Sequence, residues 1–324
     1  MIAFINSPFQ AYVLRCYLSS LKIAEPITVI IREYNNNKEL SDNNAIKQCL
    51  IGKNIDYIII RNGISKFKIF LIFYKVFFAK LIIIGDLLNK FNTFFLMFKF
   101  KKIDTLLLED GTSFHVDNAE IYAEIIKHSI DNGFCISGIP DNKYGEFKIK
   151  LGQNYPLPLS DKNKLLYKST DKFIILGSPL IEHNVSSEND YDNDLEQLIS
   201  YVEGSNVLGD IVYFRHRREK EERLRTVLSR ITNTKCDIRR STIGFDIDLL
   251  SSQMNHYLND KVLISFPSTA ILVLAQNNLL YGCKKLCLKK SSIISNAAFQ
   301  ERSDRIFDLC LELLIKKGIN HVVL

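Results

Sequence analysis

Two adjacent carboxylates, Glu109 and Asp110, come directly after the apolar run Leu106–Leu108 and before Gly111. A carboxylate that is half-buried at such a place loses hydration, which raises its pKa and suits it to accept a proton as a general base. Asp-Gly is also a common turn dipeptide, so an exposed turn is the alternative. The acid pair is therefore a candidate base at the end of a strand.

A second candidate is cationic. The run Ile211–Phe214 leads into Arg215, His216, Arg217 and Arg218. At the start of a helix, backbone N–H groups and such cations converge to bind a phosphate. A solvated first turn of a charged helix is the alternative, but four cations at that place oppose the helix dipole. The pattern therefore favours a bound anion.

Hydroxyl and amide side chains follow two further strand-like runs. Ser268 and Thr269 come after residues 262–266, and Asn6 to Gln10 come after the first residues of the chain, with Pro8 suited to a first helical turn. Helix capping alone is the alternative for both groups. Ser268 and Thr269 can also donate to a phosphate. A carboxylate in one half of the chain and two anion-binding helix starts in the other predict group transfer.

Several common sites are disfavoured. Neither half contains G-x-G-x-x-G or G-x-x-x-x-G-K-[ST], which argues against a dinucleotide dehydrogenase and a P-loop NTPase. The seven cysteines include no Cys-x-x-Cys pair, so reduced thiols in a cytoplasm fit better than disulfides or a zinc ribbon. Asp246-Ile247-Asp248 resembles a metal-binding Asp-x-Asp only superficially, because we expect it to open a helix.

Alternating strands and helices must position these residues. Strands are expected at residues 2–5, 27–31, 57–60, 105–108, 173–176, 211–214, 235–239, 262–265 and 285–288. Helices are expected at residues 9–21, 43–50, 67–98, 192–202, 219–230, 246–258 and 304–317, and one starting at 268. The alternation predicts an α/β fold of two doubly wound, Rossmann-like domains, whose ligands bind at the carboxyl ends of the strands. We place these domains at residues 1–160 and 161–324, with the Gly- and Pro-rich segment after Asp131 as the linker.

One segment accounts for the net charge of +6, because the rest of the chain is close to neutral. Residues 66–102 carry eight lysines against one aspartate, a net charge of +7, and phenylalanines spaced by three and four. We interpret residues 65–102 as a basic, aromatic helical hairpin. Its lysines either extend outward from a core helix or lie at an anionic membrane surface. No stretch reaches the roughly 18 apolar residues of a membrane span. Nucleic-acid binding is disfavoured because no recognition motif accompanies the lysines.

The strand ends together resemble motifs of bacterial sialyltransferases, especially the lipooligosaccharide sialyltransferases and the related capsular polysialyltransferases. Family members typically show an Asn-Ser/Thr-Pro-x-Gln strand end, an acidic Asp/Glu-Asp-Gly motif, a His-Pro motif and a Ser-Ser/Thr motif, in that order. The counterparts here are residues 6–10, 109–111, 216–217 and 268–269, and residues 176–180 look like the opening of the family's second domain. The resemblance spans nearly the whole chain through short motifs.

The resemblance implies a two-domain GT-B fold with a central cleft. It implies inverting transfer of sialic acid, or a related nonulosonic acid, from a CMP-sugar to a capsule or lipooligosaccharide glycan, with no metal or other cofactor. Asp110 would deprotonate the acceptor hydroxyl with Glu109 beside it, and His216 would assist the departing phosphate. The donor would lie near Ser268 and Thr269 (phosphate), Gly177 and Pro179 (nucleotide), Asp246 (ribose or cytosine), and Asn6, Gln10 and Arg217. The enzyme would be cytoplasmic and peripheral to the inner face of the membrane, with no nucleic-acid partner.

One residue departs from the family pattern. Arg217 stands where the family has proline, so the backbone restriction that would help to place His216 is absent. The extra guanidinium suits a phosphate or the carboxylate of the donor. Two other interpretations stay open: a GT-B transferase with another nucleotide sugar, and a catalytically inert membrane- or partner-binding protein of the same fold.

Overall fold

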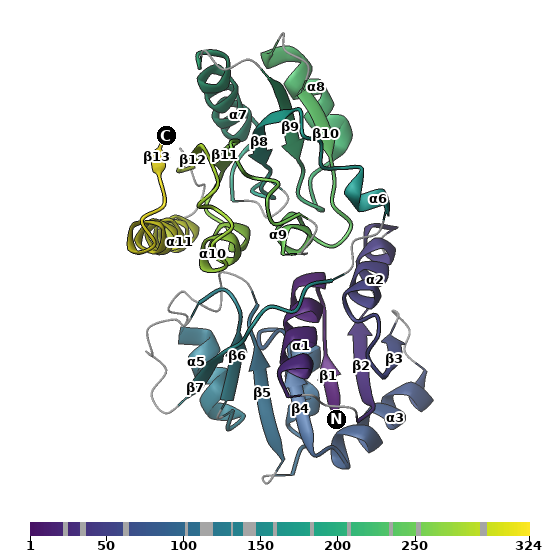
Figure 1. The fold of residues 1–324 in the computed structure, drawn as a ribbon. Helices are drawn as coiled ribbons and strands as arrows, with labels where there is room; N and C mark the ends of the chain where they lie inside the picture. Colours follow the sequence, from purple (N-terminus) through teal and green to yellow (C-terminus); the bar gives the residue numbers. More distant parts are fainter. Residues whose placement is uncertain are drawn as a thin grey trace. The chain divides into compact units, whose positions relative to one another are not determined.

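The computed structural model describes residues 1–21, 25–32, 37–60, 65–100, 103–110, 119–130, 132–138, 147–157, 161–181, 185–205, 209–232, 236–250, 254–291 and 297–324. The chain divides into two compact units, Met1–Tyr155 and Pro156–Leu324 (Figure 1). Their boundary lies a few residues before the place expected from the sequence.

The first unit is built on a parallel seven-stranded sheet. Its strands are β1 (Ile2–Phe4), β2 (Ile27–Arg32), β3 (Ile55–Ile60), β4 (Leu81–Ile84), β5 (Asp104–Leu108), β6 (Asn132–Cys135) and β7 (Lys148–Leu151). Its helices are α1 (Pro8–Ser20), α2 (Asn37–Cys49), α3 (Lys66–Phe77), α4 (Lys90–Leu96) and α5 (Ala119–Lys127). The strand order is β3-β2-β1-β4-β5-β6-β7. The chain therefore winds outward from β1, crosses back and continues from β4, which is the Rossmann arrangement with its switch point between β1 and β4.

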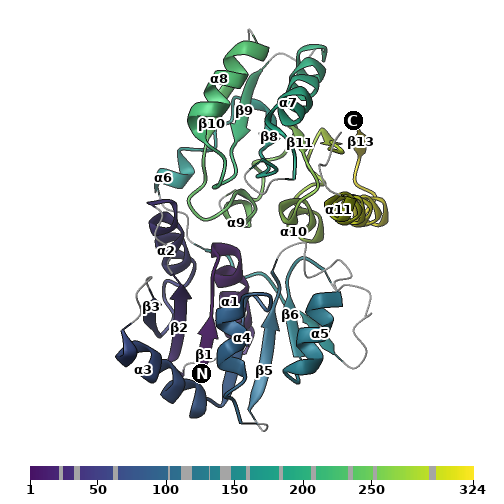
Figure 2. The same cartoon turned by 180° about the vertical axis from the view of Figure 1, so that it is seen from behind.

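Helices cover the faces of this sheet. Three helices share one core with alternate strand residues: α3 contributes Ile72 and Val76, α4 contributes Phe95 and Leu96, and α5 contributes Ile121 and Ile125. Figure 2 shows α4 in front of the sheet, on the face turned away from the viewer in Figure 1. Right-handed crossovers place α1 and α2 on the opposite face. The polar residues that follow the strands therefore lie at the sheet edge, outside these cores.

Strand β4 contradicts the predicted helical hairpin over residues 65–102. Ile82, Ile83 and Ile84 are fully buried, and β4 pairs in parallel with both β1 and β5. The segment is thus helix, strand, helix. A run of β-branched residues fits a strand that is buried on both faces, whereas the phenylalanine spacing on either side of it has the period of a helix.

Strands β6 and β7 contradict the predicted linker after Asp131. They pair with each other and extend the sheet beyond β5. Their glycines serve packing: a Cβ at Gly133 would lie 2.7 Å from Cζ of Phe147, and a Cβ at Gly152 would collide with the ring of Phe134. Glycine is therefore required where an aromatic ring lies against the backbone.

The second unit repeats this plan with six parallel strands. They are β8 (Asp171–Leu176), β9 (Asp210–Phe214), β10 (Cys236–Arg239), β11 (Val262–Ser265), β12 (Lys285–Leu288) and β13 (His321–Val323). The helices are α6 (Asp161–Lys164), α7 (Glu188–Glu203), α8 (Glu221–Ile231), α9 (Phe245–Leu249), α10 (Thr269–Gln276) and α11 (Ala297–Lys316). The order β10-β9-β8-β11-β12-β13 is again the Rossmann order, with its switch point between β8 and β11.

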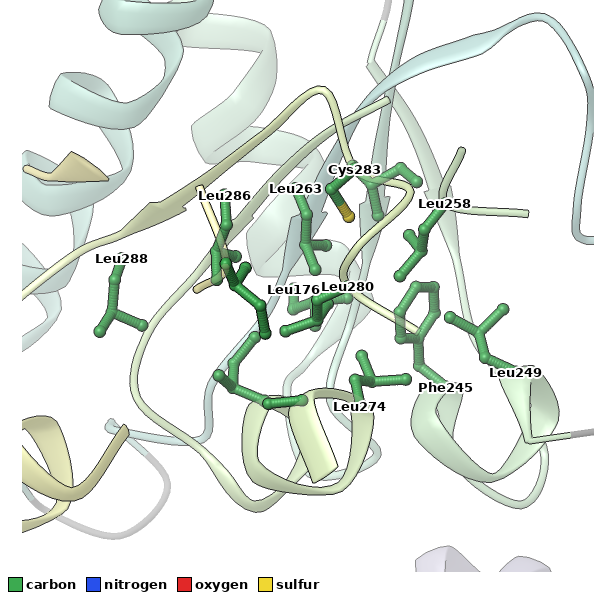
Figure 3. Close-up of a cluster of buried hydrophobic side chains, with 14 of the residues drawn as sticks. Leu176, Phe245, Leu249, Leu258, Leu263, Leu274, Leu280, Cys283, Leu286 and Leu288 are labelled. Atoms are coloured by element: carbon green, nitrogen blue, oxygen red, sulfur yellow. The ribbon is translucent and has the colours of Figure 1, made fainter. Parts of the chain in front are cut away.

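Alternate residues of these strands serve two cores. Ile174 and Leu176 face α9, α10 and α11, whereas Phe173 and Ile175 face α7 and α8. Figure 3 shows the first of these cores, in which Leu274 of α10 and Phe245 of α9 point toward the strands. Burial on both faces explains why the strands read as continuous runs of Ile, Val and Leu.

The predicted fold class is confirmed: an α/β chain of two Rossmann-like, doubly wound units in tandem, as in the GT-B class. Strand β12 has the predicted bounds, and α10 begins at Thr269, one residue after the predicted start, with Ser268 as its N-cap. The helix predicted over residues 246–258 is much shorter, because α9 ends at Leu249. Within the described ranges, no helix has the length and apolarity needed to cross a membrane. The cleft between the two units stays a prediction.

Candidate functional site

In the first unit, polar residues gather at the carboxyl ends of three neighbouring strands. Asn6 follows β1, Asp86 follows β4, and the pair Glu109 and Asp110 follows β5. The strands are parallel, so these ends meet at one sheet edge, which includes the switch point between β1 and β4. Gly111 lies outside the described residues.

Gln10 connects the start of α1 to Asp110. The Ser7 side chain caps α1 by accepting the N–H of Gln10, and Pro8 occupies the first turn, as predicted. The Gln10 side chain is buried; its Oε1 accepts the Asn6 N–H at 2.8 Å, and its Nε2 donates to Oδ1 of Asp110 at 2.6 Å. The backbone bond fixes which end of the amide faces Asp110, so Gln10 holds the carboxylate in place.

Glu109 has a different environment from its neighbour. Its side chain is fully buried and accepts hydrogen bonds from the backbone N–H groups of Ile136 (2.7 Å) and Ser137 (3.2 Å) and from the Ser137 hydroxyl. Asp110 is only half-buried. Glu109 therefore joins the end of β5 to the chain that leaves β6, and Asp110 is the carboxylate of the pair that a substrate can reach.

Asp86 is a further acid at this edge, and sequence reasoning missed it. It lines a pocket together with Asp110; the other lining residues are Gly85, Leu87, Leu88, Leu107, Leu108 and Ile121. Burial raises the pKa of Asp86, although its Oδ1 accepts the Leu88 N–H at 3.0 Å. A Cβ at Gly85 would lie 2.5 Å from Oε1 of Gln10, so glycine is required there. The apolar run ending in Gly-Asp was the available signal, hidden by the hairpin interpretation.

In the second unit, the predicted donor residues other than Asp246 follow β8, β9 and β11, three neighbours in the sheet. Gly177 and Pro179 follow β8, and the Gly177 N–H continues the ladder by donating to the Phe214 carbonyl at 2.9 Å. The N–H of Ser178 donates to the Tyr191 hydroxyl at 3.2 Å. The structure thus brings Gly177 and Pro179 to the switch point between β8 and β11.

His216 lies in a turn, not at a helix start, because α8 begins only at Glu221. The N–H of Arg218 donates to Nδ1 of His216 at 3.2 Å. A neutral imidazole that accepts at Nδ1 carries its proton on Nε2. The turn therefore presents His216 as a hydrogen-bond donor through Nε2.

The buried carboxylate of Glu219 fixes this turn. Its Oε2 accepts the His216 N–H at 2.5 Å, and its Oε1 accepts the hydroxyls of Tyr213 (2.7 Å) and Tyr191 (2.9 Å). Both tyrosines are fully buried, and their proximity to Glu219 adds to the burial that raises the pKa of each. A Cβ at Gly177 would collide with Oε2 of Glu219. Glycine at 177 thus makes room for the group that positions His216.

The arginines of the turn have unequal roles. Arg215 is used within the protein: its Nη1 donates to the Glu219 carbonyl at 3.0 Å, and its Nη2 lies 3.3 Å from the Glu221 carboxylate. The idea of four cations opening a helix is therefore wrong. Arg217 lies half-buried in the same turn, directly after His216. Its position is compatible with contact to a bound anion beside His216.

Ser268 and Thr269 begin α10 after β11. Ser268 is the N-cap residue, with φ −158° and ψ 163°, yet its side chain makes no capping hydrogen bond to the helix. Its carbonyl accepts the N–H of Ile271 at 3.1 Å. Side-chain capping therefore does not explain Ser268. Because the first N–H groups of a helix lack intrahelical partners, this half-exposed start can bind an anion.

The two acids of Asp246-Ile247-Asp248 face different surroundings. Asp248 is fully buried and accepts hydrogen bonds from Nδ2 of Asn163 (2.9 Å) and the hydroxyl of Tyr167 (2.6 Å). Asp246 is half-buried in the first turn of α9, which follows β10 through a loop. The described part of the chain holds no group of three His, Cys, Asp or Glu residues placed to share a metal ion. Asp246 and Asp248 therefore do not face one common site.

Asp248 makes a pH dependence testable. Burial raises its pKa from 3.8 to about 6, so the folded protein keeps this proton through a range in which the unfolded chain has lost it. Its contribution to the free energy of unfolding therefore falls as the pH rises from about 4 to about 6, by about 2–3 kcal/mol. We expect urea titrations to show this fall in the wild type but not in Asp248→Asn. A constant difference between the two proteins from pH 4 to 7 would show an ordinary pKa.

Comparison with known proteins adds a structural similarity. No protein-family model and no curated protein sequence matches the chain. Among solved structures, it is similar to the crystal structure of MurG from Acinetobacter baumannii, with a TM-score of 0.41 and 11% sequence identity over 98% of this chain and 93% of that one. The function is therefore inferred from the residues of the two sheet edges.

Proposed function

We propose that the protein is an inverting, metal-independent glycosyltransferase that moves sialic acid, or a related nonulosonic acid, from a CMP-sugar to a cell-surface glycan of the capsule or lipooligosaccharide type. The observation that carries this proposal is the carboxylate of Asp110, oriented by Gln10 at one switch point. The second unit supplies the complementary groups at the ends of β9 and β11, the two neighbours of β8: the Nε2–H of His216 and the start of α10. A base in one unit and anion donors in the other fit a transfer reaction.

The first half of the reaction is the activation of the acceptor. Asp110 takes the proton of the acceptor hydroxyl while its oxygen forms a bond to the anomeric carbon of the donor. Gln10 donates to Oδ1 of this carboxylate and keeps it in one orientation. Glu109 acts as a positioning residue, because it is fully buried and its oxygens accept backbone N–H groups. A general base at this place contributes roughly 10²–10⁴ in rate.

The second half is the departure of CMP. The bond between the anomeric carbon and the phosphate oxygen breaks, and its electron pair leaves with the phosphate. The Nε2–H of His216, the Ser268 hydroxyl and the first N–H groups of α10, beginning with Thr269, stabilise the added charge. Arg217 pairs with the phosphate or with the carboxylate of the donor. Since CMP leaves with a single phosphate, this set of donors replaces a divalent cation. Gly177, Pro179 and Asp246 hold the nucleoside.

The proposal places the enzyme in the cytoplasm, at the inner face of a bacterial membrane, with a glycan or glycolipid as acceptor. A second candidate is a GT-B transferase that uses another nucleotide sugar, such as a UDP-sugar. An inert binding protein of the same fold would need neither Asp110 nor His216.

The test is a thermal-shift screen of the purified protein against CMP, CDP, UDP and CMP-sialic acid. A ligand at 100 times its dissociation constant adds about 2.7 kcal/mol of stability. We expect CMP and CMP-sialic acid to raise the melting temperature in the presence of EDTA, and Arg217→Ala to reduce the shift. A shift with UDP alone would indicate a transferase that uses another nucleotide sugar. No shift with any nucleotide would favour the inert binding protein.

A further inference from the structure

The outward sides of α3 and α4 carry an unusual concentration of exposed aromatic residues. Among the described residues, every exposed phenylalanine lies between residues 67 and 100. We call the following set the aromatic surface: Phe67, Phe70, Tyr74, Phe77, Phe78, Phe94, Met97, Phe98 and Phe100. Phe67, Phe70, Phe78 and Met97 are each 66–73% exposed. Exposed apolar groups of this number indicate an interaction site rather than chance.

Several side chains of the aromatic surface contact one another. The ring of Phe78 lies 4.8 Å from that of Tyr74 and 5.1 Å from that of Phe77, and Phe77 lies 4.2 Å from Phe100. These contacts continue the surface from α3 through the turn after it to the chain beyond α4. A second group of aromatic rings connects α3 to α4.

This second group is centred on Phe73, a partly buried residue of α3. Its ring lies 5.9 Å from Phe94 and 4.7 Å from Phe98, which are themselves 5.2 Å apart. The core beneath needs only a narrow stripe of each helix, since Ile72 and Val76 of α3 are fully buried. The exposed rings of the aromatic surface are therefore not needed to cover the sheet.

The lysines of the segment divide by position. Lys75 and Lys99 turn inward and donate to the hydroxyls of Thr28 (2.9 Å) and Thr105 (2.7 Å). Four others stay exposed beside the aromatic surface: Lys66, Lys68, Lys80 and Lys90. Of these, Lys68 donates to the Ile59 carbonyl at 3.0 Å. In the described chain from 65 to 100, Asp86 is the sole acid. It is half-buried and lines the pocket described above.

Exposed aromatic rings and four exposed lysines on one segment, whose single acid is the half-buried Asp86, match one partner best. We propose that the aromatic surface docks on an anionic lipid membrane, with its rings at the boundary between headgroups and acyl chains and Lys66, Lys68, Lys80 and Lys90 at the lipid phosphates. A second copy of the chain would bring the same lysines against each other across a two-fold axis, which like-charge repulsion opposes. The inference adds the binding surface to the proposed location and does not depend on the donor.

Co-sedimentation with lipid vesicles tests this inference apart from transfer activity. We expect the wild type to bind vesicles of phosphatidylglycerol and phosphatidylcholine, to bind pure phosphatidylcholine far less, and to dissociate in 1 M salt. Lys66→Gln and Lys90→Gln should each weaken binding about fivefold. The double variant Phe70→Ser/Phe78→Ser should weaken it about tenfold or more. All four side chains are exposed, so the variants should melt within a few degrees of the wild type.

The matched control is Leu165→Ser/Ile315→Ser, which removes two side chains that are 77% and 62% exposed in the other unit. It should bind vesicles like the wild type. The proposal is overturned if anionic vesicles do not bind the wild type at low salt, or if the control loses as much binding as the aromatic variant. It is equally overturned if sedimentation equilibrium finds a dimer that Phe70→Ser/Phe78→Ser dissociates while vesicle binding is unchanged.

Discussion

Asp110→Asn is expected to lower the rate of sugar transfer at least about 10²-fold while the protein stays folded. Asparagine has the shape of aspartate, and its Oδ1 can still accept the Nε2–H of Gln10, a bond of 2.6 Å in the wild type. It cannot take the proton of an acceptor hydroxyl at neutral pH, so the loss should appear in kcat rather than in the affinity for CMP. The measurement is a transfer assay beside a CMP-induced thermal shift, and the shift should equal that of the wild type.

Two neighbouring acids provide the controls for this result. Glu109→Gln keeps an amide oxygen that can accept both backbone N–H groups, which share Oε2 in the wild type, but it removes the negative charge that strengthens these bonds. It should therefore lower the melting temperature and affect transfer less than Asp110→Asn. Asp86→Asn tests the other acid of the pocket, whose raised pKa would also suit a base. If Asp110→Asn keeps transfer within a few-fold and Asp86→Asn abolishes it, the base is Asp86.

The sequence predicted most strands because a strand that is buried on both faces has a continuous run of Ile, Val and Leu. The same signal was present in Leu81–Ile84, but phenylalanines at helical spacing on both sides masked it. The strands after Asp131 were missed for another reason. Gly133 and Gly152 resemble loop residues, yet each is glycine because a phenylalanine that is distant in sequence lies against its backbone. Only the tertiary contact distinguishes the two uses of glycine.

The candidate site was predictable as a set of strand ends, because the carboxyl ends of parallel strands lie at the same edge of a sheet. The supporting contacts were not. Gln10 and Asp110 are a hundred residues apart, and Glu219 reaches Tyr191 across twenty-eight. Glu219 itself was expected to begin a helix, whereas α8 begins only at Glu221. Its buried position under the His216 turn depends on the space left by Gly177. Such roles follow from side-chain packing, which spacing along the chain does not report.

His216→Asn is expected to lower transfer at least about 10²-fold and to weaken the CMP-induced thermal shift, with little change in the stability of the unliganded protein. In this variant the amide Oδ1 takes the place of Nδ1 and can still accept the Arg218 N–H, which lies 3.2 Å from Nδ1 in the wild type. The donor at Nε2 is lost. Because the donor acts on charge that develops on the leaving phosphate, kcat should fall more than the affinity for CMP.

His216→Gln separates this role from a purely structural one. Glutamine can place an amide N–H near the position of Nε2 but not an acceptor at Nδ1, so it should recover part of the transfer rate lost in His216→Asn. If His216 only shaped the turn, the order would reverse: asparagine would behave like the wild type, and glutamine would be the damaging change. Glu219→Gln would then be as harmful to transfer as any change at His216, because the turn depends on the His216 N–H that Glu219 accepts at 2.5 Å. The rank order of the three variants, measured with CMP-sialic acid, therefore decides whether His216 contacts the leaving group.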